Sequence, residues 1–252
     1  MLLDEVKATL AMENLYLTEE QEKLLQSYAD GEISFKEFQE QISKLTEDSK
    51  VAWILEATTF DKVYCYPGTE VLINNFNEHD PRVLSQYERL YTGARIIDLL
   101  KKPIQGKFDL PHLKAIHKYI FQDIYPWAGE LRQVNISKEI LFCDAQFIEK
   151  TINKVFDELA QENFLRDCSE KKIAEKAAYY LGEINAVHPF REGNGRAQRE
   201  FVRELLIPLG FKVDYSLCDP KMMLYASINA FAGDYELMTE LFDKCIIAKP
   251  QN

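Results

Sequence analysis

The chain is organised around residues 187–200, which read VHPFREGNGRAQRE. Before this stretch, apolar residues recur at three- and four-residue spacing from Ile173 to Val187, which predicts a helix that Pro189 ends. A second helix is expected to open near Asn194 and to stop before Pro208. Two helices therefore meet at a short loop, and that loop holds most of the polar residues of the stretch.

The triplet Gly193-Asn194-Gly195 lies at the expected start of the second helix. Free backbone N–H groups and the positive end of the helix dipole favour an anion there, and glycines let it approach the backbone closely. Arg196 and Arg199 are three residues apart, so they share one face of the first turn. Two guanidinium groups beside a row of amides suit a di- or triphosphate better than a single carboxylate.

His188 and Glu192 are the candidate reactive groups of the loop. His188 is the residue of this stretch that exchanges a proton near neutral pH, so it is the candidate general base. Glu192 is the candidate ligand for Mg²⁺, which proteins usually bind through one or two carboxylates plus phosphate oxygens. Phe190 is apolar in a polar loop, and we expect it to anchor the loop in the core. The combination indicates transfer of a nucleotide phosphate to a hydroxyl group.

The order of these residues resembles the Fic family signature, HxFx(D/E)GNGRxxR, at every defined position from His188 to Arg199. The segments YPGT at 66–69 and YPWAGELR at 125–132 are also similar to Fic sequences. The resemblance implies a mainly helical, all-α fold with one small β-hairpin, called the flap. It also implies transfer of AMP from ATP, with Mg²⁺, to a Tyr, Thr or Ser hydroxyl of a target protein.

The resemblance implies a role for each residue of the motif. His188 takes the proton of the target hydroxyl, Glu192 holds Mg²⁺, and Arg199 takes the γ-phosphate. The implied phosphate-binding set is Gly193, Asn194, Gly195, Arg196 and Arg199. The flap, which covers the site and docks the target segment, is implied at Ile136, Ser137, Lys138, Glu139 and Ile140.

Residues 1–50 are expected to form a small helical module ahead of the catalytic domain. The first helix is predicted from Leu2 to about Tyr16, and Thr18 and Ser34 are typical N-caps of two more. Three short helices can hardly bury a core alone, so the module is expected to pack on the rest of the chain. It resembles the separate antitoxins of bacterial Fic toxins, here fused to the enzyme.

The first helix carries Thr9-Leu-Ala-Met-Glu13-Asn14, which is similar to the inhibitory motif (S/T)xxxE(G/N) of Fic systems. In those systems the glutamate lies against the second arginine of the catalytic motif, here Arg199. A carboxylate in that place would occupy the donors meant for the γ-phosphate and repel the negative tail of ATP. Glu13, with Thr9 and Asn14, is therefore the expected inhibitor of the site.

The remaining chain divides into a linker at 51–63, a catalytic domain at 64–210 and C-terminal helices at 211–252 that pack on it. Helical spacing predicts further helices, and His112 and His117 on one of them are interpreted as structural. The expected helices run over Val83–Leu100, Leu110–Ile124, Phe147–Leu165, Met222–Phe231 and Tyr235–Ile247.

The composition is that of an acidic globular protein, with 252 residues, 46% hydrophobic residues and a net charge of −11. That charge argues against a general nucleic-acid or membrane-surface binder. Five scattered cysteines without a CxxC pair indicate neither a disulfide framework nor a zinc site, and they favour a reducing compartment. The absence of a spanning segment or a signal-peptide pattern then predicts a cytoplasmic bacterial protein.

Two other functions stay open at this stage. In the first, Glu13 aligns a water molecule that removes AMP from a modified protein, so that the helix is catalytic rather than inhibitory. In the second, the chain is a nucleotide-sensing interaction domain without catalytic activity. The sequence leaves the target protein, the modified hydroxyl, the oligomeric state and the choice between toxin, effector and regulator open.

Overall fold

The structure of the protein is a computed structural model that describes residues 2–47, 61–138 and 140–248. Most of the expected linker at 51–63 lies outside the described residues, as does Glu139 of the expected flap. The α-helices are α1 (Leu2–Ala11), α2 (Glu19–Ala29), α3 (Phe35–Glu47), α4 (Pro81–Lys101), α5 (Leu110–Phe121), α6 (Ile148–Gln161), α7 (Ile173–Val187), α8 (Asn194–Leu206), α9 (Pro220–Phe231) and α10 (Glu236–Cys245). Short 3-10 helices are η1 (Ala145–Phe147), η2 (Asn163–Leu165), η3 (Glu170–Lys172), η4 (Ile207–Leu209) and η5 (Tyr215–Leu217). The strands are β1 (Ser137–Lys138), β2 (Ile140–Leu141), β3 (Phe211–Val213) and β4 (Ile246–Ala248).

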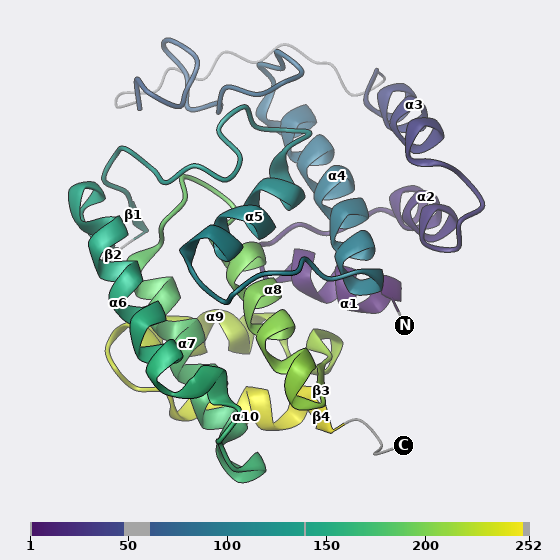
Figure 1. Ribbon diagram of the computed structural model, residues 1–252. Coiled ribbons are helices and arrows are strands. Elements are labelled where there is room, and N and C mark those ends of the chain that lie inside the picture. Colours follow the sequence, from purple (N-terminus) through teal and green to yellow (C-terminus); the bar gives the residue numbers. More distant parts are fainter. Residues whose placement is uncertain (1, 48–60, 139, 249–252) are drawn as a thin grey trace.

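The predicted fold class is confirmed, because helices make up most of the described chain and a small antiparallel hairpin accompanies them (Figure 1). In that hairpin, Ser137 of β1 lies opposite Leu141 of β2. The two helices of the central motif, α7 and α8, begin and end where the apolar spacing and Pro189 predict. The sequence therefore specified the elements that carry the candidate site.

A second small sheet, β3 paired antiparallel with β4, was not predicted. The helix expected to reach Ile247 ends at Cys245, and Ile246 begins a strand. Both isoleucines are β-branched and favour an extended backbone. Pairing with β3 then satisfies backbone groups that a helix would otherwise have used, which explains why the prediction was wrong here.

The helix expected over Phe147–Leu165 is shorter than predicted, because α6 ends at Gln161. Asn163, Phe164 and Leu165 all have a positive φ, between 51° and 63°. An α-helix needs a negative φ at every residue, so it cannot pass through three successive left-handed residues. Apolar spacing continued past Gln161 and did not reveal this local reversal.

The central helix α8 is covered by other elements on all sides. It packs against α5 and α7, and β3 lies against its far end (Figure 1). Every residue from Arg196 to Leu206 is buried, including charged ones that need partners. The carboxylates provide these, as Glu200 pairs with Arg203 at 2.6 Å and Glu204 pairs with His112 at 2.9 Å. The helix that carries the motif is therefore held rigidly.

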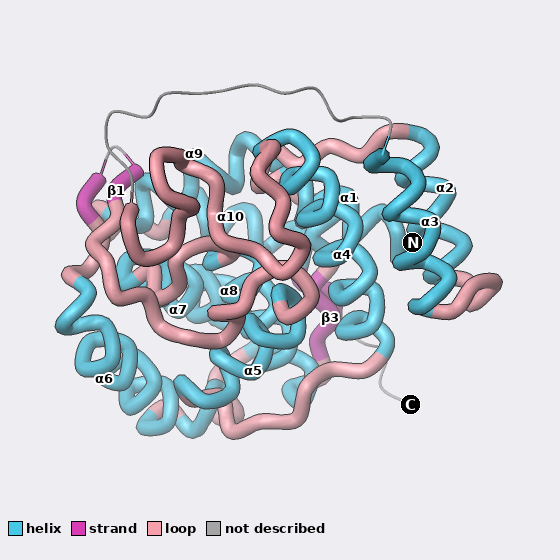
Figure 2. The backbone as a smooth tube through the Cα atoms, turned by 90° about the horizontal axis from the view of Figure 1, so that it is seen from above, coloured by secondary structure: helices cyan, strands magenta, loops and turns pink. Residues whose placement is uncertain are grey.

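The described part of the N-terminal module, residues 2–47, packs on the rest of the protein through α4. Figures 1 and 2 show α2 and α3 together on the outer side of α4, with α1 nearer the centre. The buried apolar residues of these three helices belong to the main hydrophobic core, and they are Val6, Leu10, Leu24, Leu25, Ala29, Phe38 and Ile42. The first helix is thus built into the body of the protein, close to the motif.

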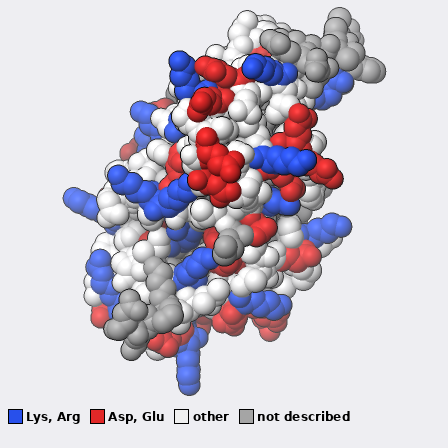
Figure 3. Space-filling model, turned by 90° about the vertical axis from the view of Figure 1, so that its right-hand side faces the viewer, with Lys and Arg blue, Asp and Glu red and all other residues white. Residues whose placement is uncertain are grey.

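The surface carries mixed charge. On the face drawn in Figure 3, acidic and basic side chains alternate, and neither sign forms a broad field. Of the helices described, none combines the length and the apolar character that crossing a membrane requires.

Candidate active site

The backbone at the end of α7 places His188. Its N–H donates to the Ile184 carbonyl at 3.1 Å, and its φ of 51° and ψ of 63° are left-handed. Such values are uncommon outside glycine and need support from the surrounding structure. Pro189 follows and cannot continue the helix. The chain therefore turns sharply at the histidine.

Arg132 supports this turn, a role that was not predicted from the sequence. Its guanidinium is buried and donates to the His188 carbonyl at 2.8 Å, to the Val187 carbonyl at 3.3 Å and to the Val134 carbonyl at 2.7 Å. It also donates to the Cys143 carbonyl, just after β2. Burial lowers the pKa of Arg132. One side chain thus joins the backbone of the candidate base to both ends of the hairpin.

Asn194 closes the loop between the two helices. Its Oδ1 accepts from the Phe190 N–H and its Nδ2 donates to the Phe190 carbonyl, both at 2.8 Å. The Asn194 side chain, which we expected to contact phosphate, thus holds the loop instead, and the groups at this position that remain open to an anion are backbone amides. Phe190 is itself buried, with its ring stacked on His117 at 3.8 Å between centroids.

His117 holds the loop from the other side. Its Nδ1 accepts from the Gly129 N–H at 2.8 Å, so Nε2 carries the proton that is donated to the Glu192 carbonyl at 2.9 Å. Burial lowers the pKa of His117 to about 3, so the ring is neutral at physiological pH. This histidine has the structural role that the sequence indicated, and it positions the backbone of the candidate metal ligand.

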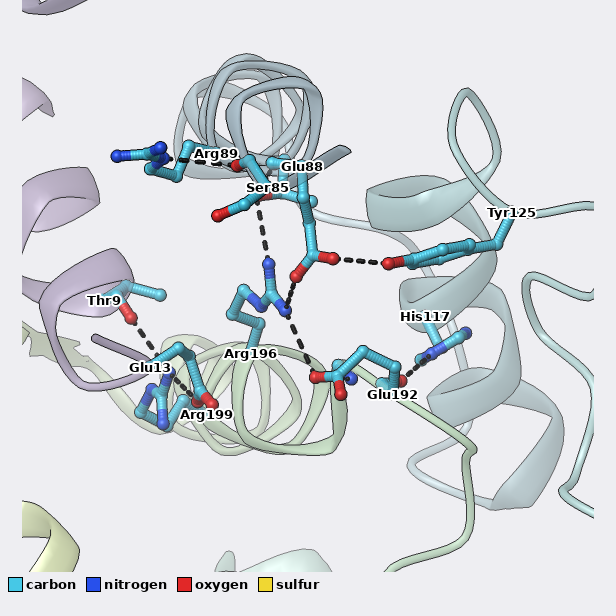
Figure 4. Close-up of polar contacts among 12 residues, drawn as sticks. Thr9, Glu13, Ser85, Glu88, Arg89, His117, Tyr125, Glu192, Arg196 and Arg199 are labelled. Carbon is cyan, nitrogen blue, oxygen red and sulfur yellow. Dashed lines mark hydrogen bonds and ion pairs between the residues drawn. The ribbon is translucent and has the colours of Figure 1, made fainter. Parts of the chain in front are cut away.

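The two arginines of the motif point in different directions, as Figure 4 shows. Arg199 Nη2 lies 2.8 Å from Glu13 Oε1 and donates to the Thr9 carbonyl at 3.1 Å. The contribution of Thr9 to this contact is its backbone rather than its hydroxyl. A Cβ atom on Gly195 would lie 2.0 Å from Glu13 Oε1, so only glycine leaves room for that carboxylate.

Arg196 faces α4 instead, and its side chain is 1% exposed. Its Nη2 lies 2.5 Å from Glu88 Oε1, and Tyr125 donates to the other oxygen of Glu88. Burial alone would lower the pKa of Arg196, but nearby carboxylates, Glu88 foremost, raise it above its usual value. Arg196 is thus directed at Glu88 and does not line the pocket beside His188, and its expected phosphate contact stays a prediction. Arg196 joins α8 to α4, and its partner Glu88 was not predicted from the sequence.

Removing Glu88 should strongly destabilise the protein, because it would leave the buried Arg196 guanidinium with only the more distant Glu192 carboxylate, at 3.6 Å, and the Thr92 hydroxyl, at 3.3 Å. We expect Glu88→Ala to lower the free energy of unfolding by about 3–5 kcal/mol. Urea unfolding followed by circular dichroism measures this. The control is Glu149→Ala, an exposed glutamate on α6, which should change stability by less than about 0.5 kcal/mol. Equal losses in the two variants would contradict the assignment.

Glu13 lies in a turn that closes α1, and not on the helix as we expected. The helix ends at Ala11, and Asn14 has a φ of 57°. The Leu15 N–H donates to the Leu10 carbonyl and the Asn14 N–H donates to the Ala11 carbonyl, both at 3.0 Å. This is the Schellman pattern, which needs a left-handed residue such as Gly or Asn. The (G/N) position of the motif is therefore explained by the left-handed backbone that this turn requires. The turn directs the Glu13 side chain toward the site.

The left-handed backbone of Asn14 makes a specific prediction about stability. Asn14→Val should lower the free energy of unfolding by about 1–2 kcal/mol, because a β-branched side chain is strained at this φ. Asn14→Gly should be nearly neutral, since glycine adopts the same backbone freely. Thermal unfolding of both variants measures the difference. Similar losses in both would show that the asparagine side chain, rather than the backbone angle, is what matters.

A pocket of about 350 Å³ opens beside the motif. Its polar end is lined by His188, Glu192, Gly195 and Arg199, together with Glu13. These groups come from the turn that closes α1, the α7–α8 loop and the start of α8, so the fold brings together parts of the chain almost 190 residues apart. Asn194 also lines it, whereas Arg196 does not.

The pocket also has an apolar part, whose residues were not predicted from the sequence. It is lined by Leu224, Ile228 and Phe231 of α9 and by Phe142, which follows the hairpin. The Phe142 ring stacks on the His188 ring at 3.9 Å between centroids and an interplanar angle of 18°. One feature of the sequence could have indicated this role, because α9 has more apolar residues than a single buried face requires. Two of them, Leu224 and Ile228, are 53% and 43% exposed in the structure.

The hairpin that we expected to be the flap lies next to this pocket. Ile136 precedes β1, and its carbonyl accepts from the Phe142 N–H at 3.4 Å. Ser137 and Lys138 form β1, and Ile140 begins β2. The chain passes directly from β2 to Phe142, whose ring stacks on His188.

A metal ion at this site would rely on Glu192. Among residues 2–47, 61–138 and 140–248, no group of three or more Asp, Glu, His or Cys side chains could hold a metal by itself. Mg²⁺ is commonly held by one or two carboxylates together with phosphate oxygens. One carboxylate in a pocket suited to phosphates fits that mode, and it does not fit a metal site made by protein alone.

Comparison with known proteins identifies the family. A family model described as "Fic/DOC family" matches residues 107–206. A protein of Sinorhizobium fredii, named as a probable protein adenylyltransferase, is 42% identical over 172 residues, which cover 68% of this chain and 88% of that protein. This chain belongs to the Fic/DOC family. The resemblance of the sequence to Fic proteins is thereby confirmed.

Other Fic proteins share both sequence and fold with this chain. The probable protein adenylyltransferase Fic of Escherichia coli is 34% identical over 185 residues, covering 73% of this chain and 91% of that protein. A crystal structure of the Bartonella tribocorum effector BepC with bound AMPPNP has a TM-score of 0.68 at 28% identity, over 74% of this chain and 97% of that one. A Bartonella quintana Fic domain with bound ADP has a TM-score of 0.69 at 29% identity, over 74% and 95%.

Proposed function

We propose that this Fic protein transfers AMP from ATP to a Tyr, Thr or Ser hydroxyl of a target protein and that Glu13 holds it in an inhibited state. The adenylyltransferase class is supported by the names of its relatives. The observation that carries the proposal is one pocket in which His188, Glu192 and Gly195 meet an arginine, Arg199, that Glu13 already occupies.

ATP is proposed to lie along the pocket with its phosphates at the start of α8. The helix dipole and the free amides of its first turn attract the phosphate oxygens, and Arg199 takes the γ-phosphate. The adenine lies against the apolar end of the pocket at Leu224 and Ile228. Mg²⁺ held by Glu192 would neutralise part of the phosphate charge.

The target hydroxyl is proposed to enter beside the β1–β2 hairpin, whose free edge can pair with an extended segment. His188 takes the proton of this hydroxyl as its oxygen bonds to the α-phosphorus. The bond from the α-phosphorus to the β-bridging oxygen breaks, and pyrophosphate leaves. The stacked Phe142 ring and the Arg132 contact to the His188 carbonyl orient the imidazole, which favours proton transfer by a positioned group.

Inhibition is proposed to follow from the Glu13 contact. While Glu13 occupies Arg199, the γ-phosphate cannot bind there and ATP is not held for in-line attack. Residues 2–47 then act as a fused, antitoxin-like inhibitory unit on the catalytic part of the chain. We place the reaction in the bacterial cytoplasm, where ATP is available and where the five free cysteines stay reduced.

The position of the radioactive label in ATP tests the reaction type. The Glu13→Gly variant, in which no carboxylate occupies Arg199, is incubated with a bacterial lysate, Mg²⁺ and ATP labelled at either the α- or the γ-phosphate. AMP transfer labels a protein band from α-labelled ATP and leaves no label from γ-labelled ATP. Label from γ-labelled ATP would mean phosphate transfer. Nucleotide binding without any label would favour the sensing domain, and Glu13-dependent release of AMP from a modified protein would favour AMP removal.

A further inference from the structure

Two amide side chains form part of the pocket wall and have no role in the proposed reaction. Gln198 on α8 donates from Nε2 to Asn185 Oδ1 on α7 at 3.0 Å, and both residues line the pocket. Gln198 is 5% exposed, yet its Oε1 has no hydrogen-bond partner within the described residues. Buried polar atoms are nearly always paired, so an orphaned acceptor in a ligand pocket points to a donor on the ligand.

The position of this pair along the helices indicates which part of a nucleotide it meets. Gln198 is three residues beyond Gly195, and Asn185 is three residues before His188. Each therefore lies about 4.5 Å along its helix from the phosphate end of the pocket. Because α7 runs toward the loop and α8 runs away from it, both displacements have the same direction.

The group that follows the α-phosphate in a nucleotide is the ribose, and the base lies farther away. The apolar side chains of α9 account for the base end of the pocket, since they offer a flat ring an apolar surface. The amide pair lies one helical turn from the phosphate-binding loop, which is the distance at which the ribose would follow the α-phosphate. A ribose hydroxyl both donates and accepts, so it would satisfy Gln198 whichever way round the two amides are turned.

We propose that Gln198, held in place by Asn185, recognises a ribose hydroxyl of the bound nucleotide. Gln198 is then a specificity residue that makes the enzyme prefer ribonucleotides to deoxyribonucleotides. This inference rests on the proposed function, since it requires an adenine nucleotide in the pocket.

The test combines a change in the protein with a change in the ligand. Affinities for ATP, 2′-deoxy-ATP and 3′-deoxy-ATP are measured by calorimetry for Glu13→Gly and for Glu13→Gly with Gln198→Leu. The second change should weaken ATP binding about tenfold. It should leave the affinity for one of the two deoxynucleotides unchanged, because that ligand lacks the same hydrogen bond. A structural role would weaken all three ligands equally, and this result would overturn the proposal.

Three controls separate the possible failures. Gln161→Leu, an exposed glutamine at the end of α6, should change none of the affinities. Asn185→Ala leaves Gln198 present but unheld, so it should reduce the preference for ATP over the sensitive deoxynucleotide if Gln198→Leu fails to fold. Inosine triphosphate differs from ATP only in the base, so Gln198→Leu should weaken its binding by the same factor of about ten.

The outcomes also distinguish this inference from the proposed function. Gln198→Leu could change the affinities for inosine triphosphate and ATP by different factors and those for ATP and the two deoxynucleotides by the same factor. In that case Gln198 contacts the base, and the ribose assignment is wrong. If Glu13→Gly binds ATP and transfers AMP but shows no coupling to the ribose, the proposed function stands and only this inference fails. If it binds no nucleotide, both fail.

Discussion

Glu13→Gly is expected to raise the rate of AMP transfer by about 10- to 100-fold over the wild type. The reason is that Glu13 occupies Arg199 through a charge-assisted hydrogen bond at 2.8 Å. Such bonds contribute about 1.5–3 kcal/mol, and each 1.4 kcal/mol corresponds to a factor of ten. Glycine removes the carboxylate and leaves Arg199 open to the γ-phosphate. The measurement is the initial rate at which α-labelled ATP labels protein.

A matched change elsewhere in the N-terminal module provides the control. Glu20→Gly alters an exposed glutamate in the first turn of α2 and should leave the transfer rate unchanged. Glu13→Gln should give an intermediate rate, because the amide keeps the shape of the carboxylate but not its charge. If Glu13→Gly and the wild type label protein equally fast, Glu13 is not the inhibitor.

His188→Ala is expected to abolish AMP transfer in the Glu13→Gly background while ATP binds with nearly unchanged affinity. General-base catalysis contributes about 10²–10⁴-fold, and the ring is not among the groups proposed to hold the phosphates. Initial rates and calorimetry on the same preparation measure the two effects separately. A variant that turned over at the full rate would remove His188 from the mechanism.

The left-handed backbone of His188 calls for a second variant. Alanine is strained at a φ of 51°, so a loss of activity in His188→Ala could reflect a distorted turn. His188→Asn removes the base but keeps a residue that tolerates this conformation. Both variants should lose transfer to a similar extent. The control is His79→Ala, an exposed loop histidine, which should leave both rate and binding unchanged.

Local patterns in the sequence predicted the helices of the motif and the family to which the chain belongs. The boundaries of α7 and α8 follow from apolar spacing and from Pro189, because a helix signals its buried face and its ends within a few residues. The loop residues between them are contiguous, so their grouping needed no tertiary information. The structure brings His188, Glu192 and Gly195 together in one pocket.

The sequence could not assign the two arginines, because spacing says nothing about what lies opposite each one. Arg196 and Arg199 look equivalent at the start of α8. Only the packing of α4 against α8 brings Glu88 to Arg196, and only the position of α1 brings Glu13 to Arg199. Both carboxylates are about 110 to 190 residues away in the chain, a separation over which local periodicity carries no information.

The sequence by itself thus determined the fold class, the helices of the motif and the chemical types of group available at their junction. Tertiary structure alone decided which groups are free to meet a ligand. In the folded chain the Asn194 side chain holds the loop, Arg196 is buried, and α9 supplies apolar residues of the pocket. The physical reason is that buried polar groups need hydrogen-bond or ion-pair partners and apolar surfaces need to be shielded from water. Residues distant in the chain provide both.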